Sequence, residues 1–133
     1  MSNANYSLID LQFKQDDRGV LVVAQAFQHI PFKIERFFSI TGVGKNKARG
    51  AHAHKTLSQF LICINGSVNV VLDNGIQREN VIISNAKKGL LIPPMIWAEQ
   101  IYAGPDTVLV VLCDAEYDEN DYISEYQEFI STV

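Results

Sequence analysis

The sequence predicts an all-β domain that closes as a two-sheet sandwich or a jelly-roll barrel. Short segments rich in β-branched and aromatic residues alternate with Gly, Asn, Asp or Pro turns. No helical apolar stripe of ten or more residues precedes the C-terminal tail, which disfavours a sheet with crossover helices. The chain has 133 residues, 47% of them hydrophobic and 20% charged, which is enough for one core, so we predict a single domain over residues 1–133. The predicted strand segments are 8–13, 19–27, 33–40, 59–73, 79–84, 87–94, 99–104 and 107–115.

Turn residues predict how these segments are joined. Asn65-Gly66 and the run 73–75 (Asp-Asn-Gly) are typical of β-hairpins, so we expect antiparallel neighbours on both sides of each. The glycine-containing run 42–47 predicts a flexible loop that leads into a histidine segment. Pro93-Pro94 is expected to end the strand before it, because proline lacks a backbone donor.

The C-terminal tail carries a different pattern. Tyr122, Tyr126, Phe129 and Ile130 recur at helical spacing after an acidic turn, which predicts a short closing helix. We expect the tail tyrosines, Tyr117 included, to pack on the barrel rather than to stack on a substrate.

Charge and cysteine usage narrow the class of protein. The formal net charge of −4 disfavours binding to nucleic acid or to an anionic membrane surface, although a few basic side chains in one cleft can still hold a pyrophosphate. Cys63 and Cys113 lie inside apolar runs and are expected to be free and buried. No basic segment precedes a long apolar stretch near residue 1, and no apolar run approaches the roughly 18 residues of a membrane span, so we expect a cytoplasmic protein.

The chemically informative stretch runs from Arg49 to Lys55 and contains two of the three histidines of the chain, His52 and His54. Residues two apart project from the same face of a strand, about 6 to 7 Å apart along it, so the two imidazoles can share one ligand. An imidazole offers both protonation states near neutral pH, which suits general acid and base catalysis at a carbon next to a ketone. Arg49 and Lys55 could offset developing negative charge or hold a phosphate.

The H-x-H pair, the later Asn-Gly turn and the Gly-to-Pro-Pro segment together resemble the cupin pattern, which implies a cupin-type jelly-roll β-barrel with a short C-terminal helix. Metal-binding cupins use two histidines, a glutamate and a third histidine. Here Ser58 and Gln59 stand where the glutamate is expected, and residues 93–98 contain no histidine. His29 is expected to be a loop residue. Two imidazoles and an amide suit Zn²⁺ or Fe²⁺ poorly, so we predict no metal and no cofactor.

Three runs in order, RGAHAHKTLSQFLICINGSVNVVLDNG, KGLLIPPMIW and EYDENDYISEYQEF, resemble the sugar-nucleotide 3,4-ketoisomerases from about Ile34 to Phe129. The resemblance implies a metal-free isomerase that converts dTDP-4-keto-6-deoxyglucose to its 3-keto isomer. A transaminase would then install a 3-amino group on a deoxysugar of surface polysaccharides such as lipopolysaccharide O-antigen. It implies that His52 and His54 face the sugar ring, with their assignment to C3 and C4 left open. It also implies a homodimer, with exchange of N-terminal strands as one form.

The same resemblance implies the substrate-binding residues. Arg49 matches an arginine of the family motif, and Lys55 and Gln59 are expected near it. Trp97 and Glu99 follow the Pro-Pro turn at the expected barrel rim. For Trp97 a core aromatic role, and for Glu99 a place at a solvated strand end, are as well supported as substrate binding. Family members often carry tyrosines in the strand before the histidine loop, whereas this chain has Arg-Phe-Phe-Ser at 36–39, which leaves the product open between galacto-like and gluco-like at C4.

Three alternatives remain from the sequence. A sugar-nucleotide epimerase of the related barrel class would pair a histidine base with a tyrosine acid, for which Tyr102 is the candidate in the barrel strands. A non-catalytic cupin module would use the histidine segment only to recognise a sugar nucleotide. A metal-dependent dioxygenase or isomerase would recruit Glu99 as an added carboxylate ligand.

Overall fold

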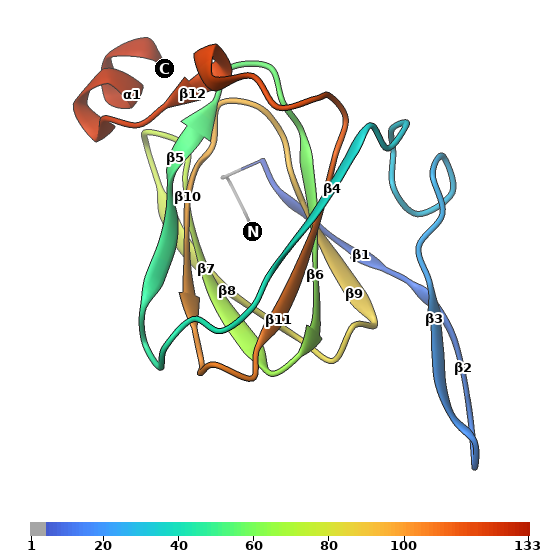
Figure 1. The fold of residues 1–133 in the computed structure, drawn as a ribbon. Coiled ribbons are helices and arrows are strands. Elements are labelled where there is room, and N and C mark those ends of the chain that lie inside the picture. Colours follow the sequence, from blue (N-terminus) through green and yellow to red (C-terminus); the bar gives the residue numbers. More distant parts are fainter. Residues whose placement is uncertain (1–4) are drawn as a thin grey trace.

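Two five-stranded antiparallel sheets face each other and form the body of the molecule (Figure 1). The computed structural model describes residues 5–133. One sheet has the strand order β1-β9-β6-β11-β4 and the other β12-β5-β10-β7-β8, while β2 and β3 form a separate two-stranded sheet. The elements are β1 (Ser7–Asp10), β2 (Gln12–Asp16), β3 (Gly19–Val23), β4 (Arg36–Ile40), β5 (Ala48–His54), β6 (Gln59–Asn65), β7 (Ser67–Asp73), β8 (Arg78–Ser84), β9 (Lys88–Ile92), β10 (Trp97–Tyr102), β11 (Val108–Cys113), the 3-10 helix η1 (Glu119–Asp121), β12 (Tyr122–Ile123) and α1 (Tyr126–Thr132).

The main core lies between the two sheets. Leu61 of β6, Val70 of β7 and Leu109 of β11 have no exposed surface, and they belong to one apolar cluster contributed by both sheets. Burial of this apolar surface is the main favourable term in folding. The predicted all-β class with a short C-terminal helix is therefore confirmed.

The turn at Asn65-Gly66 does not form the predicted hairpin. β6 pairs with β9 and β11, whereas β7 pairs with β8 and β10, so the chain crosses from one sheet to the other at this turn. Gly66 has a φ of 74°, and a Cβ on it would lie 2.5 Å from the Thr107 hydroxyl oxygen. The glycine thus makes a corner against the 107 segment, a tertiary contact that turn chemistry does not reveal.

The positions of the other predicted connections are confirmed, whereas the flexibility of the 42–47 loop stays a prediction. β7 and β8 form an antiparallel hairpin around residues 74–77, β9 ends at Ile92 before the two prolines, and no strand or helix occupies residues 41–47. The Gly75 and Ile76 amides donate to the side chains of Asp73 and Asn74, which satisfies the backbone of that turn.

The tail is only partly the helix that its spacing predicts. α1 begins at Tyr126, and Tyr122 instead lies in β12, which pairs with the end of β5. Phe129 has no exposed surface and packs with Trp97, Ile123 and Ala53 in a separate apolar cluster. α1 therefore covers one end of the second sheet, near the histidine strand (Figure 1).

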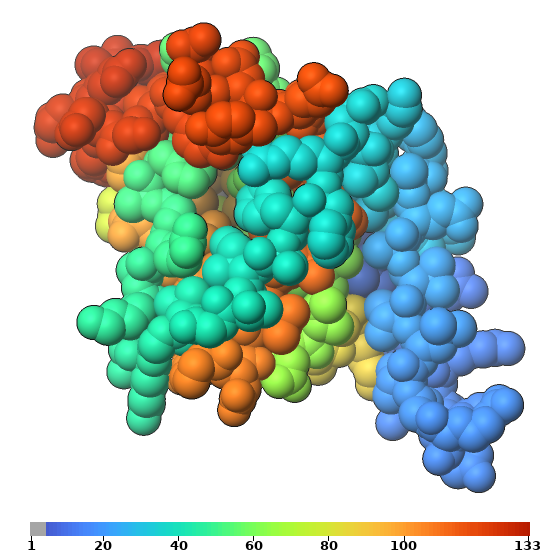
Figure 2. Space-filling model, viewed as in Figure 1, coloured from blue at the N-terminus to red at the C-terminus, as the bar shows by residue number. Residues whose placement is uncertain are grey.

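The β2–β3 hairpin stands off from the barrel. Its strands pair only with each other, and Figure 2 shows it as an arm beside the body of the molecule. Phe13, Val20 and Leu21 on this arm are 47%, 49% and 61% exposed. The hairpin thus presents apolar surface that the chain does not cover.

Two smaller expectations can be compared with the structure. Cys63 and Cys113 are free and buried, as predicted. Among residues 5–133, no helix has the length and apolar content needed to cross a membrane.

Candidate active site

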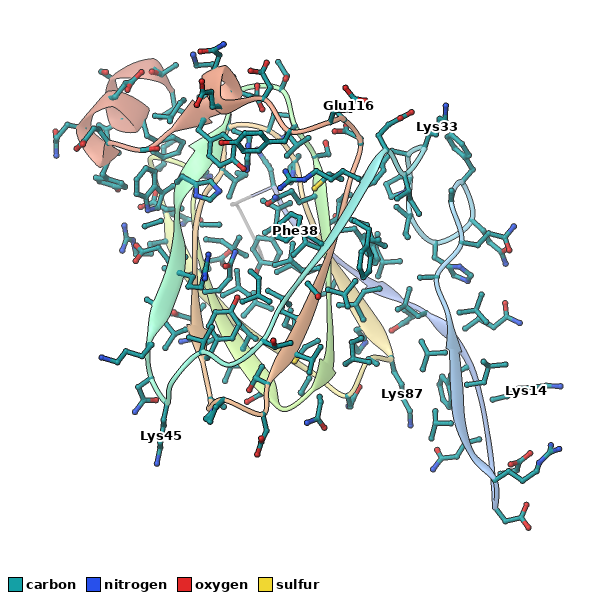
Figure 3. All side chains as sticks on the ribbon, in the orientation of Figure 1. Lys14, Lys33, Phe38, Lys45, Lys87 and Glu116 are labelled. Atoms are coloured by element: carbon teal, nitrogen blue, oxygen red, sulfur yellow. The ribbon has the colours of Figure 1, made fainter. Side chains whose placement is uncertain are left out.

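A cavity of about 600 Å³ opens between the edge strand β4 of one sheet and β5 of the other. Figure 3 shows Phe38, one of its lining residues, between the two sheets. A concave site of this size can enclose a nucleotide sugar in part, and polar groups converge on it from several strands. Its lining residues are Arg36, Phe38, Ser39, Ile40, Thr41, Arg49, Gly50, His52, Gln59, Gln100, Val111 and Tyr122.

The two histidines of β5 lie together, as their spacing predicts. Their ring centroids are 4.8 Å apart and the rings meet edge to face. His52 lines the cavity, whereas His54 is 6% exposed and does not line it. The pair therefore offers one imidazole to the cavity and a second one in contact with it that lines a smaller neighbouring pocket.

A β-bulge brings Arg49 to the same cavity as His52. The alternation of a regular strand would place residues 49 and 52 on opposite faces. In the structure, however, His52 pairs with Ala98 and Arg49 pairs with Gln100. The two positions are three residues apart on β5 but two residues apart on β10, so β5 has one extra residue between them. Gly50, with a φ of 75°, supplies the left-handed conformation that such a bulge favours.

The tail completes the wall around the histidines. β12 pairs with β5 so that Tyr122 lies opposite His54, and the Lys55 amide donates to the Asp121 carbonyl at 2.9 Å. The Tyr122 ring lies 4.7 Å from the His52 ring and 4.4 Å from the His54 ring, and Tyr122 lines the cavity. The expectation that the tail tyrosines serve only packing is therefore incomplete for Tyr122, whereas Tyr126 does pack on Trp97, at 5.3 Å between rings.

Burial keeps both imidazoles neutral at neutral pH. It lowers the pKa of His52 from 6.5 to about 4, with a smaller contribution from the neighbouring His54. Burial also lowers the pKa of His54, but the Asp121 carboxylate acts in the opposite direction, and the Arg36 guanidinium lowers it slightly further. A neutral imidazole facing the cavity is chemically a proton acceptor.

Two guanidinium groups line the cavity without a carboxylate partner. Neither Arg36 nor Arg49 forms an ion pair within residues 5–133. The Arg36 guanidinium instead lies over the rings of Phe38 and Tyr117, at 4.6 Å and 5.1 Å from their centroids. Such charges are available to an anionic ligand.

The structure brings some predicted site residues together and not others. Arg49, His52 and Gln59 line the cavity, with Gln59 only 8% exposed. The exposed Lys55 side chain donates to the Asn120 carbonyl at 3.1 Å and does not line the cavity.

Trp97 and Glu99 also lie away from the cavity lining. Trp97 is 4% exposed and packs under α1, and its indole nitrogen donates to a Glu99 carboxylate oxygen at 3.3 Å. Tyr102, the tyrosine that an epimerase reading would need, has no exposed surface and does not line the cavity either. Its burial raises its pKa to about 12.

No group of three or more His, Cys, Asp or Glu side chains within residues 5–133 is arranged to hold a metal ion. His29 lies in a turn, where its Nδ1 accepts from the Gln25 amide at 3.0 Å. The predicted absence of a metal stays a prediction.

Sequence reasoning missed four residues of this region. Gln100 faces the bulge, and Arg36 belongs to a strand that was noted only for its lack of tyrosine. Asp121 ends the acidic turn of the tail and Tyr122 begins a strand that the helical spacing of the tail masked. For Asp121 and Tyr122, the run EYDENDYISEY, which resembles a family motif, was a signal that could have found them; Arg36 and Gln100 had no such signal in the sequence.

The chain matches the family described as WxcM-like, C-terminal, over residues 4–133. It is 39% identical over 121 residues to a TDP-4-oxo-6-deoxy-alpha-D-glucose-3,4-oxoisomerase of Aneurinibacillus thermoaerophilus, a match that covers 90% of this chain and 87% of that protein. The catalytic class of this relative agrees with the resemblance seen in the sequence.

Solved structures agree with this match. A sugar 3,4-ketoisomerase from Thermoanaerobacterium thermosaccharolyticum, in complex with TDP, superposes with a TM-score of 0.94 at 37% identity and covers 98% of this chain and 96% of its own. A 4-keto-6-deoxy sugar epimerase from Streptomyces spheroides shares the fold at 16% identity, with a TM-score of 0.76 over 88% of this chain and 67% of its own, which confirms the predicted cupin-type fold. The chain belongs to the WxcM-like family, whose similar members include TDP-sugar 3,4-ketoisomerases.

Proposed function

We propose that this protein is a 3,4-ketoisomerase that converts TDP-4-keto-6-deoxyglucose to the 3-keto isomer. The observation that carries the proposal is the histidine pair, with His52 in the cavity wall and the ring centroid of His54 4.8 Å from that of His52. A histidine-to-asparagine variant of the Thermoanaerobacterium enzyme, 36% identical to this chain, was solved with TDP-4-keto-6-deoxyglucose. That ligand is our proposed substrate here.

The reaction needs two proton transfers at neighbouring carbons and no net oxidation. A base removes the C3 proton while the C4 ketone oxygen gains a proton, which forms an enediol with a C3–C4 double bond. The C3 hydroxyl then loses its proton as C4 gains one, which leaves the ketone at C3. We assign the base that faces the sugar to His52, because it is the imidazole that lines the cavity, and we retain His54 as its catalytic partner.

The basic residues of the cavity suit a TDP-linked substrate. Arg36 and Arg49 have no ion-pair partner within residues 5–133, and both line the cavity. A guanidinium can hold a diphosphate through paired hydrogen bonds, and it can also stabilise the negative charge that develops on an enediolate oxygen. We propose that these two arginines and Gln59 contact the substrate.

We further propose that the protein works as a homodimer, as its family resemblance implies. The supporting feature is the β2–β3 hairpin, which pairs with neither large sheet and exposes Phe13, Val20 and Leu21. A second copy would cover this apolar surface. Sedimentation velocity should give twice the mass of the chain, and Leu21→Lys should shift the population toward the monomer. A monomeric wild type at micromolar concentration contradicts this proposal.

A cytoplasmic location, expected from the sequence, also stays a prediction.

The catalytic proposal is tested by incubating chelator-treated protein with TDP-4-keto-6-deoxyglucose in D₂O and following the sugar by NMR. We expect a 3-keto product with deuterium at C3 or C4, and the coupling constants at C4 would identify its configuration. His52→Asn and His54→Asn should each lower turnover by about 10²- to 10⁴-fold. His29→Asn is the matched control, because His29 lies in a turn and does not line the cavity.

Each outcome decides between the hypotheses. Full activity in both the His52 and His54 variants would refute the proton-transfer roles. Binding of the nucleotide sugar without deuterium exchange would favour a recognition module, and activity that returns only with an added divalent ion would favour the metal-dependent alternative. Epimerisation without movement of the ketone would favour the epimerase.

A further inference from the structure

One carboxylate distinguishes the two histidines. The Asp121 carboxylate lies 3.5 Å from His54 Nδ1, and both side chains are nearly buried, at 7% and 11% exposure for His54 and Asp121. Within residues 5–133, no carboxylate lies within 4 Å of His52. Two imidazoles in contact with each other therefore have unequal surroundings.

Asp121 is held in place by the segment that follows β5. One carboxylate oxygen accepts from the Thr56 amide at 2.9 Å and from the Thr56 hydroxyl at 2.7 Å, and the other accepts from the Leu57 amide at 3.1 Å. Burial alone would raise the pKa of Asp121, but these hydrogen bonds outweigh it and lower the pKa. The carboxylate beside His54 is therefore both charged and fixed.

The other groups that face His54 do not replace this carboxylate. From β5 it meets His52, from β12 the Tyr122 ring, and from β4 the positive charge of Arg36. Burial keeps His52 neutral at neutral pH, and Arg36 disfavours a charged imidazole at His54. Glu116 and Asp118 line the small pocket beside His54, but Asp121 is the one carboxylate within 4 Å of it among the described residues.

We propose that Asp121 is a positioning residue whose charge, 3.5 Å from His54 Nδ1, keeps the imidazole proton on Nδ1. This leaves Nε2, which has no hydrogen-bond partner among the described residues, free to take a proton, and it makes His54 the imidazole of the pair that is protonated at the higher pH. His52 is then neutral before the reaction and can accept the substrate proton in the cavity. This inference rests on the proposed ketoisomerase function for its catalytic meaning. It settles a point that strand spacing leaves open, because i and i+2 imidazoles are equivalent on an isolated strand. A buried carboxylate that fixes a tautomer is a known way to tune a catalytic imidazole.

The test reads the imidazoles directly. Protein labelled with ¹⁵N-histidine is titrated by NMR between pH 3 and pH 8, with His52→Asn and His54→Asn used to assign the signals. In the wild type, we expect His54 to take up its proton at higher pH than His52, and neutral His54 to carry its proton on Nδ1. In Asp121→Asn, the midpoint of His54 should fall by at least about one pH unit, the lower end of what a close carboxylate contributes.

Two control variants separate the effect of the Asp121 charge from that of the hydrogen bonds that hold the neighbouring segment. Thr56→Val removes one donor to the Asp121 carboxylate but leaves its charge, so the order of protonation should persist. Asp114→Asn alters a second carboxylate that caps the same segment, where it accepts from the Ser58 amide at 3.0 Å, and it should also leave the His54 midpoint unchanged.

Activity is measured in parallel with TDP-4-keto-6-deoxyglucose. Asp121→Asn should lower kcat by about 10- to 100-fold, a part of what general acid–base catalysis contributes, with little change in KM because Asp121 does not line the cavity. If the titration midpoint of His52 in the wild type lies at a higher pH than that of His54, the inference is overturned, whether or not the Asp121→Asn variant folds. An unchanged His54 midpoint in folded Asp121→Asn also overturns it. A wild type with the expected titration but no isomerase activity would instead refute the proposed function and leave the assignment of charge standing.

Discussion

Gly50→Ala should destabilise the protein and weaken the candidate active site together. A methyl group at this position meets two penalties. The φ of Gly50 is +75°, a conformation that costs an L-residue about 1–2 kcal/mol. The new Cβ would also lie 2.6 Å and 2.9 Å from the amide oxygen and nitrogen of Gln100, which is 7% exposed and must leave its place.

The expected magnitude follows from these two contacts. Displacing a side chain from its rotamer costs about 0.5–1.5 kcal/mol, so the free energy of unfolding should fall by roughly 1.5–3.5 kcal/mol. For a chain of this length, that corresponds to a drop in Tm of about 6 to 14 °C. Because Gly50 and Gln100 both line the cavity, kcat/KM for the nucleotide sugar should fall as well, mainly through KM.

Two other glycines separate the penalties. Gly42 has a φ of +74° with open space around a Cβ, so Gly42→Ala should show the backbone cost alone. Gly104 has open space and no positive φ, so Gly104→Ala should leave Tm nearly unchanged. The assay is thermal unfolding followed by circular dichroism, with steady-state kinetics on each variant. If Gly50→Ala has the same Tm as Gly104→Ala, the left-handed bulge does not constrain residue 50, and both expected penalties are wrong. If its Tm equals that of Gly42→Ala, the backbone penalty is present but the expected clash with Gln100 is not.

Three further predictions concern stability and the cavity boundary. The pKa of His52 is about 4 in the folded protein and its ordinary value is 6.5, so the unfolded chain binds more protons between these two pH values. The free energy of unfolding should therefore fall as the pH drops from about 6.5 to about 4. In urea titrations at several pH values, His52→Asn should make this dependence on pH less steep. Phe129→Ala should cost about 3–5 kcal/mol in denaturant unfolding, since this ring is fully buried under α1, while Glu128→Ala on the exposed side of the helix should cost little, and equal effects would contradict the packing of α1. Lys55→Ala should leave KM unchanged, because its ammonium group points to the Asn120 carbonyl outside the cavity, and a large rise in KM would mean that Lys55 binds substrate after all.

The sequence carries the local part of this fold. β-Branched and aromatic content and turn residues depend on near neighbours, so the all-β class and most strands could be predicted, although the predicted segment 8–13 is divided between β1 and β2. Pairing partners depend on contacts between distant segments, which is why the Asn65-Gly66 turn was assigned to a hairpin although β6 and β7 lie in different sheets. The turn residues alone cannot distinguish a hairpin from a corner between sheets.

The candidate site divides in the same way. The spacing of His52 and His54 determined by itself that the two imidazoles lie side by side, because strand geometry acts over two residues. Three further features required the tertiary structure: the bulge that brings Arg49 to the face of His52, the pairing of β12 with β5, and the approach of Asp121 to His54 alone. Each of them joins segments that are distant in sequence or depends on a partner strand. The sequence therefore determined which groups could do the chemistry, and the packing of the tail and β10 against β5 decided which imidazole faces the cavity and which one lies beside a carboxylate.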